Sequence, residues 1–135
     1  MEIPRGFSFQ WDSGGNGEHT WFVLAHEKDN KFVVANISSV EGKRFVDDTC
    51  LLKPSVCNFP KIVKESFVKY REAKVLDRED LEEVLTNNPS AANSQAPCWL
   101  VDKMAAGLMM ANTTGQWVKN HYREIYSPIF SSAQE

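Results

Sequence analysis

EHTWFVLAHEKDNKFVVANISS, residues 18–39, decides the fold class because it holds two apolar runs around a short polar turn. The runs TWFVLAH and FVVANI are rich in β-branched and aromatic residues, which favour strands. The turn between them, EKDNK, carries Asp-Asn at its centre, and both residue types are common in tight turns. The stretch therefore predicts an antiparallel β-hairpin.

Period-two patterns extend this hairpin into a larger sheet. GFSFQW, residues 6–11, alternates aromatic with polar side chains, as a half-buried strand does. TCLLK, residues 49–53, predicts a short strand that ends at Pro54, and ESFVKYREAKVL, residues 65–76, predicts one outer or bent strand. Residues 54–64 between them are predicted to be irregular, because their two prolines cannot donate ladder hydrogen bonds.

The second half of the chain has a helical pattern. DREDLEEVL, residues 77–85, begins with a good N-cap in Asp77 and has acidic side chains in its first turn, where the helix dipole favours them. Residues 98–112 predict a second helix. Residues 113–126 predict a third helix that stops before Pro128.

These patterns predict a single α+β domain. Residues 1–76 form a small curled antiparallel sheet or an SH3-like barrel, and residues 77–135 form helices that cover it. No apolar run approaches the roughly 20 residues that a membrane helix needs. The N-terminus also lacks the basic start and long apolar stretch of a signal peptide, so the expected location is the cytoplasm.

The chain has three cysteines, Cys50, Cys57 and Cys98, without CxxC spacing. An odd, small number favours neither a disulfide framework nor a structural zinc site. We expect reduced thiols, with Cys98 in the core. A metal site formed by Cys50, Cys57 and His19 stays open as an alternative, but our prediction is that the chain has no metal centre and no cofactor.

His19 is the most interesting candidate for chemistry, because it follows a glycine-rich loop and precedes an apolar strand. Antiparallel pairing of the hairpin brings this end of the first strand to Ser38 and Ser39 at the end of the second, whereas His26 lies near the opposite end. Histidine titrates near neutral pH and can act as acid or base. The alternative interpretation is a plain solvent-facing loop histidine, with serines that only end a strand and begin a turn.

Residues 61–74 contain the most basic stretch of a chain whose net charge is −3. Its cations are Lys61, Lys64, Lys69, Arg71 and Lys74, with Phe67 and Tyr70 between them. Interleaved basic and aromatic residues are typical of nucleic-acid surfaces, but lysines also protect edge strands from pairing with other chains. Because the whole chain is acidic, nucleic-acid binding would require this local patch.

The order EHTWFVLAH, KFVVANISS, DDTCLL, NFP and ESFVKYREAKV resembles the PemK/MazF-like toxin group over about residues 6–76. In that group, a glycine-containing loop ending in a polar residue precedes an apolar strand, a turn, and a second strand that ends in a small polar pair. Two features differ here. Glu18-His19-Thr20 stands where better-known members have an arginine, and the opening GD(I/V) motif is absent.

The resemblance implies an SH3-like barrel and metal-independent cleavage of single-stranded RNA, in which a ribose 2′-hydroxyl attacks its own phosphate. It also implies a homodimer restrained by a cognate antitoxin protein. The catalytic residues would be His19, Ser38, Ser39 and Arg71, the last as a phosphate clamp. The residues that contact RNA would be Trp21, Lys61, Lys64, Lys69 and Tyr70, with the two aromatic rings stacking on bases.

A non-catalytic SH3-like module that binds a protein or a nucleic acid through the same cleft is the alternative function. The acidic isoelectric point, about 5.6, and the missing arginine favour this alternative. The resemblance and the set of His19, Ser38, Ser39 and Arg71 favour the ribonuclease.

Overall fold

The computed structural model describes residues 2–15, 17–28, 30–87 and 94–134. Within these residues, six strands form one sheet in which every pairing is antiparallel. The strands are β1 (Ser8–Trp11), β2 (His19–Lys28), β3 (Lys31–Ser39), β4 (Leu51–Leu52), β5 (Ser66–Val68) and β6 (Lys74–Asp77). The spatial order is β1-β2-β3-β5-β4, and β6 also pairs with β3.

The central hairpin is formed by β2 and β3, as the sequence predicts. Thr20 pairs with Ile37, and Trp21 pairs with Asn36. Asn30 has a positive φ of 65° in the connecting turn, a conformation that asparagine tolerates better than most residues. The hairpin prediction is therefore confirmed, and its register places the serine end of β3 beside the start of β2.

Strand β3 has two partners along its other edge. Residues Lys31–Val34 pair with β6, whereas Ile37–Ser39 pair with β5. Between these two strands the chain forms a short 3₁₀ helix, η1 (Tyr70–Glu72). The prediction of one bent strand over residues 65–76 is wrong, because the chain leaves the sheet at this point and buries Tyr70 instead of continuing the ladder.

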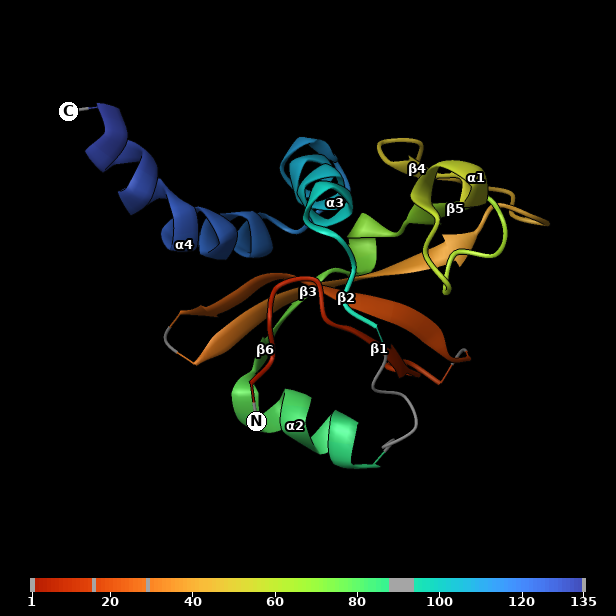
Figure 1. Ribbon diagram of the computed structural model, residues 1–135, viewed down its shortest axis with the longest axis horizontal. Coiled ribbons are helices and arrows are strands. Elements are labelled where there is room, and N and C mark those ends of the chain that lie inside the picture. The colour runs from red at the N-terminus through yellow and green to blue at the C-terminus, as the bar shows by residue number, and fades with distance from the viewer. Residues whose placement is uncertain (1, 16, 29, 88–93, 135) are drawn as a thin grey trace.

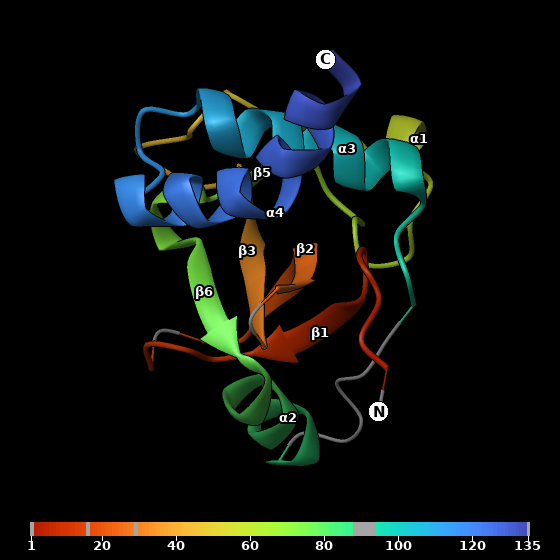
Figure 2. The ribbon, with the colours of Figure 1, turned by 90° about the vertical axis from the view of Figure 1, so that its left-hand side faces the viewer.

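Helices lie on both faces of the sheet (Figure 1). The helices are α1 (Pro54–Cys57), α2 (Arg78–Asn87), α3 (Cys98–Met110) and α4 (Gln116–Gln134). Figure 2 shows α3 and α4 above the sheet and α2 below it. Residues 54–57 are helical rather than irregular because proline is well suited to a first helical turn. The predicted stop before Pro128 is also wrong, since α4 continues to Gln134.

Side chains of β2 and β3 alternate between two apolar cores. On the side of α3, Phe22 and Ile37 join one buried cluster with Leu100, Met104 and Leu108. On the side of α2, the buried cluster contains Phe9, Trp21, Phe32, Leu81 and Leu85. Burial on both faces of the sheet explains why the two apolar runs of the hairpin are nearly continuous rather than alternating.

The outer strands end the sheet without closing it. No pairing joins β1 to β4 in the described part of the chain, so the sheet is curled but open, and the predicted α+β class with a curled antiparallel sheet is confirmed. A segment that follows α2 pairs with the residues that lead into β1. There Phe7 forms a bridge with Gln95, and the backbone N–H of Ala96 donates to the carbonyl oxygen of Gly6 at 2.8 Å. No helix among the described residues is long and apolar enough to cross a membrane.

Candidate functional site

His19 is the first residue of β2 rather than a loop residue. It pairs with Trp11 of β1 and is half-buried. The preceding loop begins at Asp12, whose Oδ1 accepts a hydrogen bond from the backbone N–H of Gly15 at 2.7 Å. The strand therefore fixes the backbone of His19, and the glycine-rich loop lines a depression together with this residue.

An open depression of about 330 Å³ lies at this end of the hairpin. We call it the His19 depression. Its lining residues are Gln10, Glu18, His19, Thr20, Ile37, Ser38, Ser39, Lys43, Lys61, Val63, Lys64 and Ser66. Five of the residues selected from the sequence are therefore neighbours of one concave surface: His19, Ser38, Ser39, Lys61 and Lys64.

The two serines are not equivalent. Ser38 is only 6% exposed and pairs with Phe67 of β5. The Ser39 hydroxyl oxygen accepts a hydrogen bond from the backbone N–H of Glu41 at 3.2 Å, so it stabilises the turn that leaves β3. A phosphate group in the depression would therefore lie against the end of β3, where neither serine offers a freely rotating hydroxyl.

Cations surround the His19 depression, and only some of them have an acidic partner. Lys64 Nζ lies 3.0 Å from Glu41 Oε2, and both side chains are largely exposed. Lys43 and Lys61 form no ion pair with a described residue. Lys43 was missed by the sequence analysis because its loop, residues 40–48, reads only as polar. The sequence EGKRF within that loop, with two cations next to an aromatic residue, was the available signal.

Trp21 and Tyr70 cannot stack on bases, so these two predictions are wrong. Both side chains are fully buried. Trp21 packs in the core on the side of α2, and its indole N–H donates to the carbonyl oxygen of Trp11 at 3.2 Å. The Tyr70 hydroxyl donates to the carbonyl oxygen of Met104 at 2.7 Å. Their large apolar rings stabilise the fold more by burial than they would at the surface.

A polar cluster missed by the sequence analysis lies next to His19. Glu72 Oε1 accepts a hydrogen bond from Nδ2 of the fully buried Asn36 at 2.9 Å, and Glu72 Oε2 lies 2.7 Å from Lys69 Nζ. Burial acts to raise the pKa of Glu72, but the hydrogen bonds from Lys69 and Asn36 and the nearby charge of His19 outweigh it and hold that pKa below its usual value. Glu72 is therefore a fixed negative charge close to His19.

Glu72 and His19 both line a second depression, the Glu72 depression. Its lining residues are Asp12, Ser13, Gly14, Gly17, His19, Lys69, Glu72 and Lys74. Lys69, predicted to bind RNA, is thus engaged by Glu72, whereas Lys74 has no acidic partner among the described residues. The residue pattern did not reveal Glu72, because a continuous strand would have placed it with Val68 and Tyr70 on one face.

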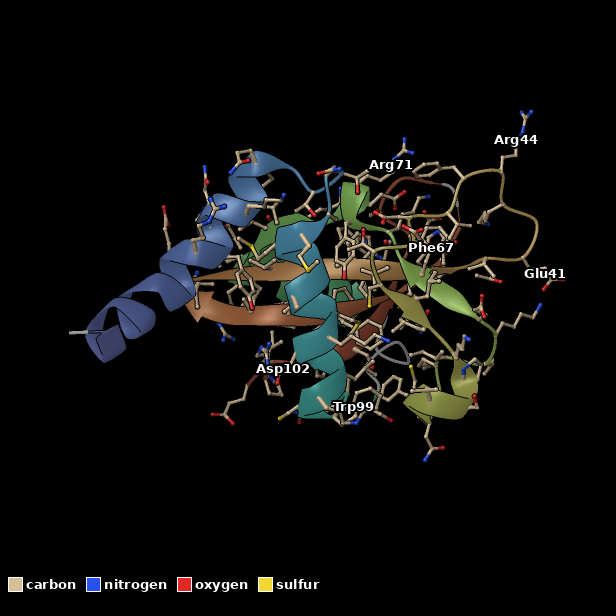
Figure 3. All side chains as sticks on the ribbon, turned by 90° about the horizontal axis from the view of Figure 1, so that it is seen from above. Glu41, Arg44, Phe67, Arg71, Trp99 and Asp102 are labelled. Carbon is tan, nitrogen blue, oxygen red and sulfur yellow. The ribbon has the colours of Figure 1, made fainter. Side chains whose placement is uncertain are left out.

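Arg71 lies outside the His19 depression. It is exposed on η1 and lines a third hollow, the Phe45 depression. The residues that line it are Lys43, Phe45, Asp47, Phe67, Lys69, Tyr70 and Arg71. The prediction that Arg71 shares one cleft with His19 and the serines is therefore not met, because η1 turns the Arg71 side chain toward the loop of residues 40–48. Figure 3 shows Arg71 and Arg44 projecting from the same side of the molecule.

The three depressions adjoin one another. His19 lines the first two, Lys43 lines the His19 and Phe45 depressions, and Lys69 lines the Phe45 and Glu72 depressions. A ligand longer than one residue or nucleotide is therefore able to contact more than one of them. The surface carries both signs of charge, as expected for an acidic chain with a local basic patch.

The cysteines do not form part of this surface. Cys50 and Cys57 are buried free thiols, and burial raises the pKa of each. Cys98 is exposed at the start of α3, so its predicted place in the core is wrong. In the part of the chain that the structure describes, no cluster of histidine, cysteine and acidic residues is arranged to hold a metal ion. Cys50, Cys57 and His19 therefore do not form the metal site left open as an alternative.

Comparison with known proteins adds no family assignment. A scan of protein-family models finds no match to the chain, and a search of curated proteins finds no similar sequence. Function must therefore be argued from the geometry of the surface and from the resemblance in residues 6–76.

Proposed function

We propose that the chain is an endoribonuclease that cleaves single-stranded RNA without a metal ion. The observation that carries the proposal is the position of His19, which lies on the rim of an open depression beside the Glu72 carboxylate and near Lys43 and Lys61, neither of which has an acidic partner among the described residues. The resemblance to PemK/MazF-like toxins supports the same reaction. A homodimer, restraint by an antitoxin protein and a cytoplasmic location belong to this proposal.

In the proposed reaction, the ribose 2′-oxygen forms a bond to phosphorus and the bond from phosphorus to the 5′-oxygen breaks, which leaves a 2′,3′-cyclic phosphate. The 2′-hydroxyl loses a proton and the leaving 5′-oxygen gains one. His19 carries out one of these two proton transfers: it accepts the proton of the 2′-hydroxyl or donates a proton to the 5′-oxygen. The negative charge of Glu72 stabilises the imidazolium that forms when the ring accepts a proton. Lys43 and Lys61 stabilise the charge that develops on the phosphate oxygens.

The test is cleavage of single-stranded RNA by purified protein in the presence of EDTA. We expect products that end in a 2′,3′-cyclic phosphate, and a loss of about a hundred- to ten-thousand-fold in rate for His19→Ala. His26→Ala is the matched control, because His26 belongs to the same strand but follows His19 by almost its whole length. Equal rates for wild type and His19→Ala would remove His19 from the mechanism.

A non-catalytic binding module is the second candidate. Two observations favour it: Arg71 is separated from His19, and acidic side chains such as Asp12, Glu18 and Glu41 are interspersed with the cations. This function predicts that the same RNA binds, or that a protein binds in its place, with no cleavage at any concentration of wild-type protein. Detection of cyclic-phosphate products that depend on His19 would exclude it.

A further inference from the structure

Three aromatic residues line the Phe45 depression: Phe45, Phe67 and Tyr70. Phe45 is 59% exposed, whereas Phe67 and Tyr70 are almost fully buried. Its volume is about 130 Å³, below the roughly 300–1,000 Å³ of a site for a drug-sized ligand. The depression is thus large enough for one planar ring rather than for a whole nucleotide.

The loop that carries Phe45 is attached to the body at both ends. At its start, the backbone N–H of Val40 donates to the carbonyl oxygen of Glu65 at 3.0 Å. At its end, the Asp47 carboxylate accepts hydrogen bonds from the Thr49 hydroxyl at 2.6 Å and the Thr113 hydroxyl at 2.8 Å. An exposed phenylalanine on an anchored loop loses little further freedom when a ligand binds.

The charges around this ring favour an anion. Arg71 and Lys43 form no ion pair with a described residue. The one carboxylate in the lining, Asp47, is already engaged by the two threonines. Burial acts to raise the pKa of Asp47, but these hydrogen bonds outweigh it, so the group stays ionised and directed toward its partners. An arginine next to an exposed aromatic ring suits a base with a phosphate attached, because guanidinium binds phosphate through two parallel hydrogen bonds.

We propose that the Phe45 depression is a nucleotide subsite, in which Phe45 stacks on one base of single-stranded RNA and Arg71 binds the phosphate next to that base. The inference rests on the proposed function, since Lys43 connects this subsite to the His19 depression where cleavage would occur. Phe45 thus takes the stacking role for which the buried Trp21 and Tyr70 are unsuitable. The preferred substrate extends beyond the two nucleotides that flank the cleaved bond.

Binding of a non-cleavable strand tests the subsite separately from catalysis. The probe is a fluorescently labelled single-stranded RNA whose 2′-hydroxyls are methylated, so that no cyclic phosphate is able to form. We expect Phe45→Ala to raise its Kd about 5- to 150-fold, which corresponds to the loss of one base–aromatic stack. Phe45→Trp should keep the wild-type Kd. Trp117→Ala is the matched control, because Trp117 is 61% exposed but lies on α4.

Arg71 is tested through the salt dependence of the same Kd. Loss of one phosphate contact reduces the slope of log Kd against log salt by about one. We expect this change for Arg71→Ala and none for Lys53→Ala, which removes an exposed cation that lines none of the three depressions. Equal slopes for wild type and Arg71→Ala would overturn the assignment of a phosphate to Arg71.

A series of probes with one abasic nucleotide identifies the stacked base. At a single position the abasic probe should bind wild type and Phe45→Ala equally, while at the other positions the loss caused by Phe45→Ala should remain. An equal loss at every position, a wild-type Kd in Phe45→Ala, or no binding of the probe by wild type would overturn the subsite. If the probe binds as expected but wild type cleaves no RNA, the proposed ribonuclease fails while the subsite stands.

Discussion

Tyr70 and Arg71 are neighbours in one turn of 3₁₀ helix, yet they belong to two different kinds of region. Tyr70 is fully buried against α3, and its hydroxyl is hydrogen-bonded to Met104. Arg71 is exposed and lines a depression where it has no described acidic partner. A single turn therefore joins a tightly packed junction of the molecule to a positively charged part of its surface. Substitutions in the first region should change stability, and substitutions in the second should change binding.

The largest effect on stability is expected for Gly107→Ala. A Cβ atom at Gly107 would lie 2.1 Å from the Tyr70 hydroxyl oxygen, so α3 and η1 would have to separate. We expect a loss of at least about 2 kcal/mol in the free energy of unfolding, measured by urea denaturation. Alanine otherwise favours a helix over glycine by about 1 kcal/mol, so the sign itself is a test.

Two variants make this test specific. Ala106→Gly, at the exposed neighbouring position of α3, should cost only about 1 kcal/mol through helix propensity. Tyr70→Leu combined with Gly107→Ala should recover part of the stability that Gly107→Ala loses, because the clashing hydroxyl and ring are gone. A more stable Gly107→Ala protein would contradict the close packing described here.

Tyr70→Phe should have the second-largest effect, about 1–2 kcal/mol at neutral pH, because it removes a buried hydrogen bond without a large change in volume. Burial, followed by the neighbouring Cys50, raises the pKa of Tyr70 far above its usual value of about 10. As the pH rises, the hydroxyl therefore ionises in the unfolded chain before it does so in the folded protein. Its contribution to the free energy of unfolding is fully present below about pH 10 and is lost as the pH rises further. Unfolding measured from pH 8 to pH 11 should show a smaller alkaline loss for Tyr70→Phe than for wild type.

Glu72 links the two regions, and its substitution should have an intermediate effect. Glu72→Ala leaves Nδ2 of the buried Asn36 without its partner, for which we expect about 1 kcal/mol. The pKa of Glu72 is lowered in the folded state, so its charge stabilises the fold at pH values above the usual pKa of a glutamate. This stabilisation is lost as the pH falls through the pKa of Glu72 in the folded state. Wild type should therefore lose more stability than Glu72→Gln between pH 6 and pH 3. Parallel curves for the two proteins would contradict this interpretation.

Arg71→Ala and Lys43→Ala should have the smallest effects on stability. Both side chains are exposed and lack a described acidic partner, so each substitution should change the free energy of unfolding by no more than about 0.5 kcal/mol. The same proteins should bind RNA more weakly. A loss of more than about 1 kcal/mol in urea denaturation would show that Arg71 and Lys43 contribute to the packing of the fold and are not only surface charges.

The sequence predicted secondary structure best where a hydrophobic pattern was compatible with only one element. The hairpin, the change from strands to helices near residue 77 and α3 all follow from periodicity that tertiary structure does not override. The hairpin register also follows, and it places His19 and the two serines on the rim of the same depression.

The sequence failed where a residue had two possible environments. Residues 65–76 alternate well enough for one strand, but burial of Tyr70 under α3 is more favourable than an unbroken ladder, and this breaks the strand at η1. That break directs Arg71 away from His19 and brings Glu72 close to it. The wrong prediction of one strand therefore misplaced two residues of the site. Trp21 shows the same ambiguity, since a tryptophan suits either a core or a stacking surface. Phe45 lies in a loop, and no local sequence pattern predicts where that loop lies in the fold.

The pairing at the start of the β1 edge has a consequence for behaviour at high concentration. An exposed strand edge is a template on which another chain adds a strand, and this is a common route to aggregation and amyloid. Here residues 95–96 pair with residues 6–7, which lead into β1, and at the other end of the sheet β4 has only two residues. Gly6 makes the cover possible, because a Cβ at this position would lie 2.8 Å from the carbonyl oxygen of Ala96. The glycine thus lets this segment approach the start of the sheet edge, where it blocks pairing with another chain, without contributing a side chain.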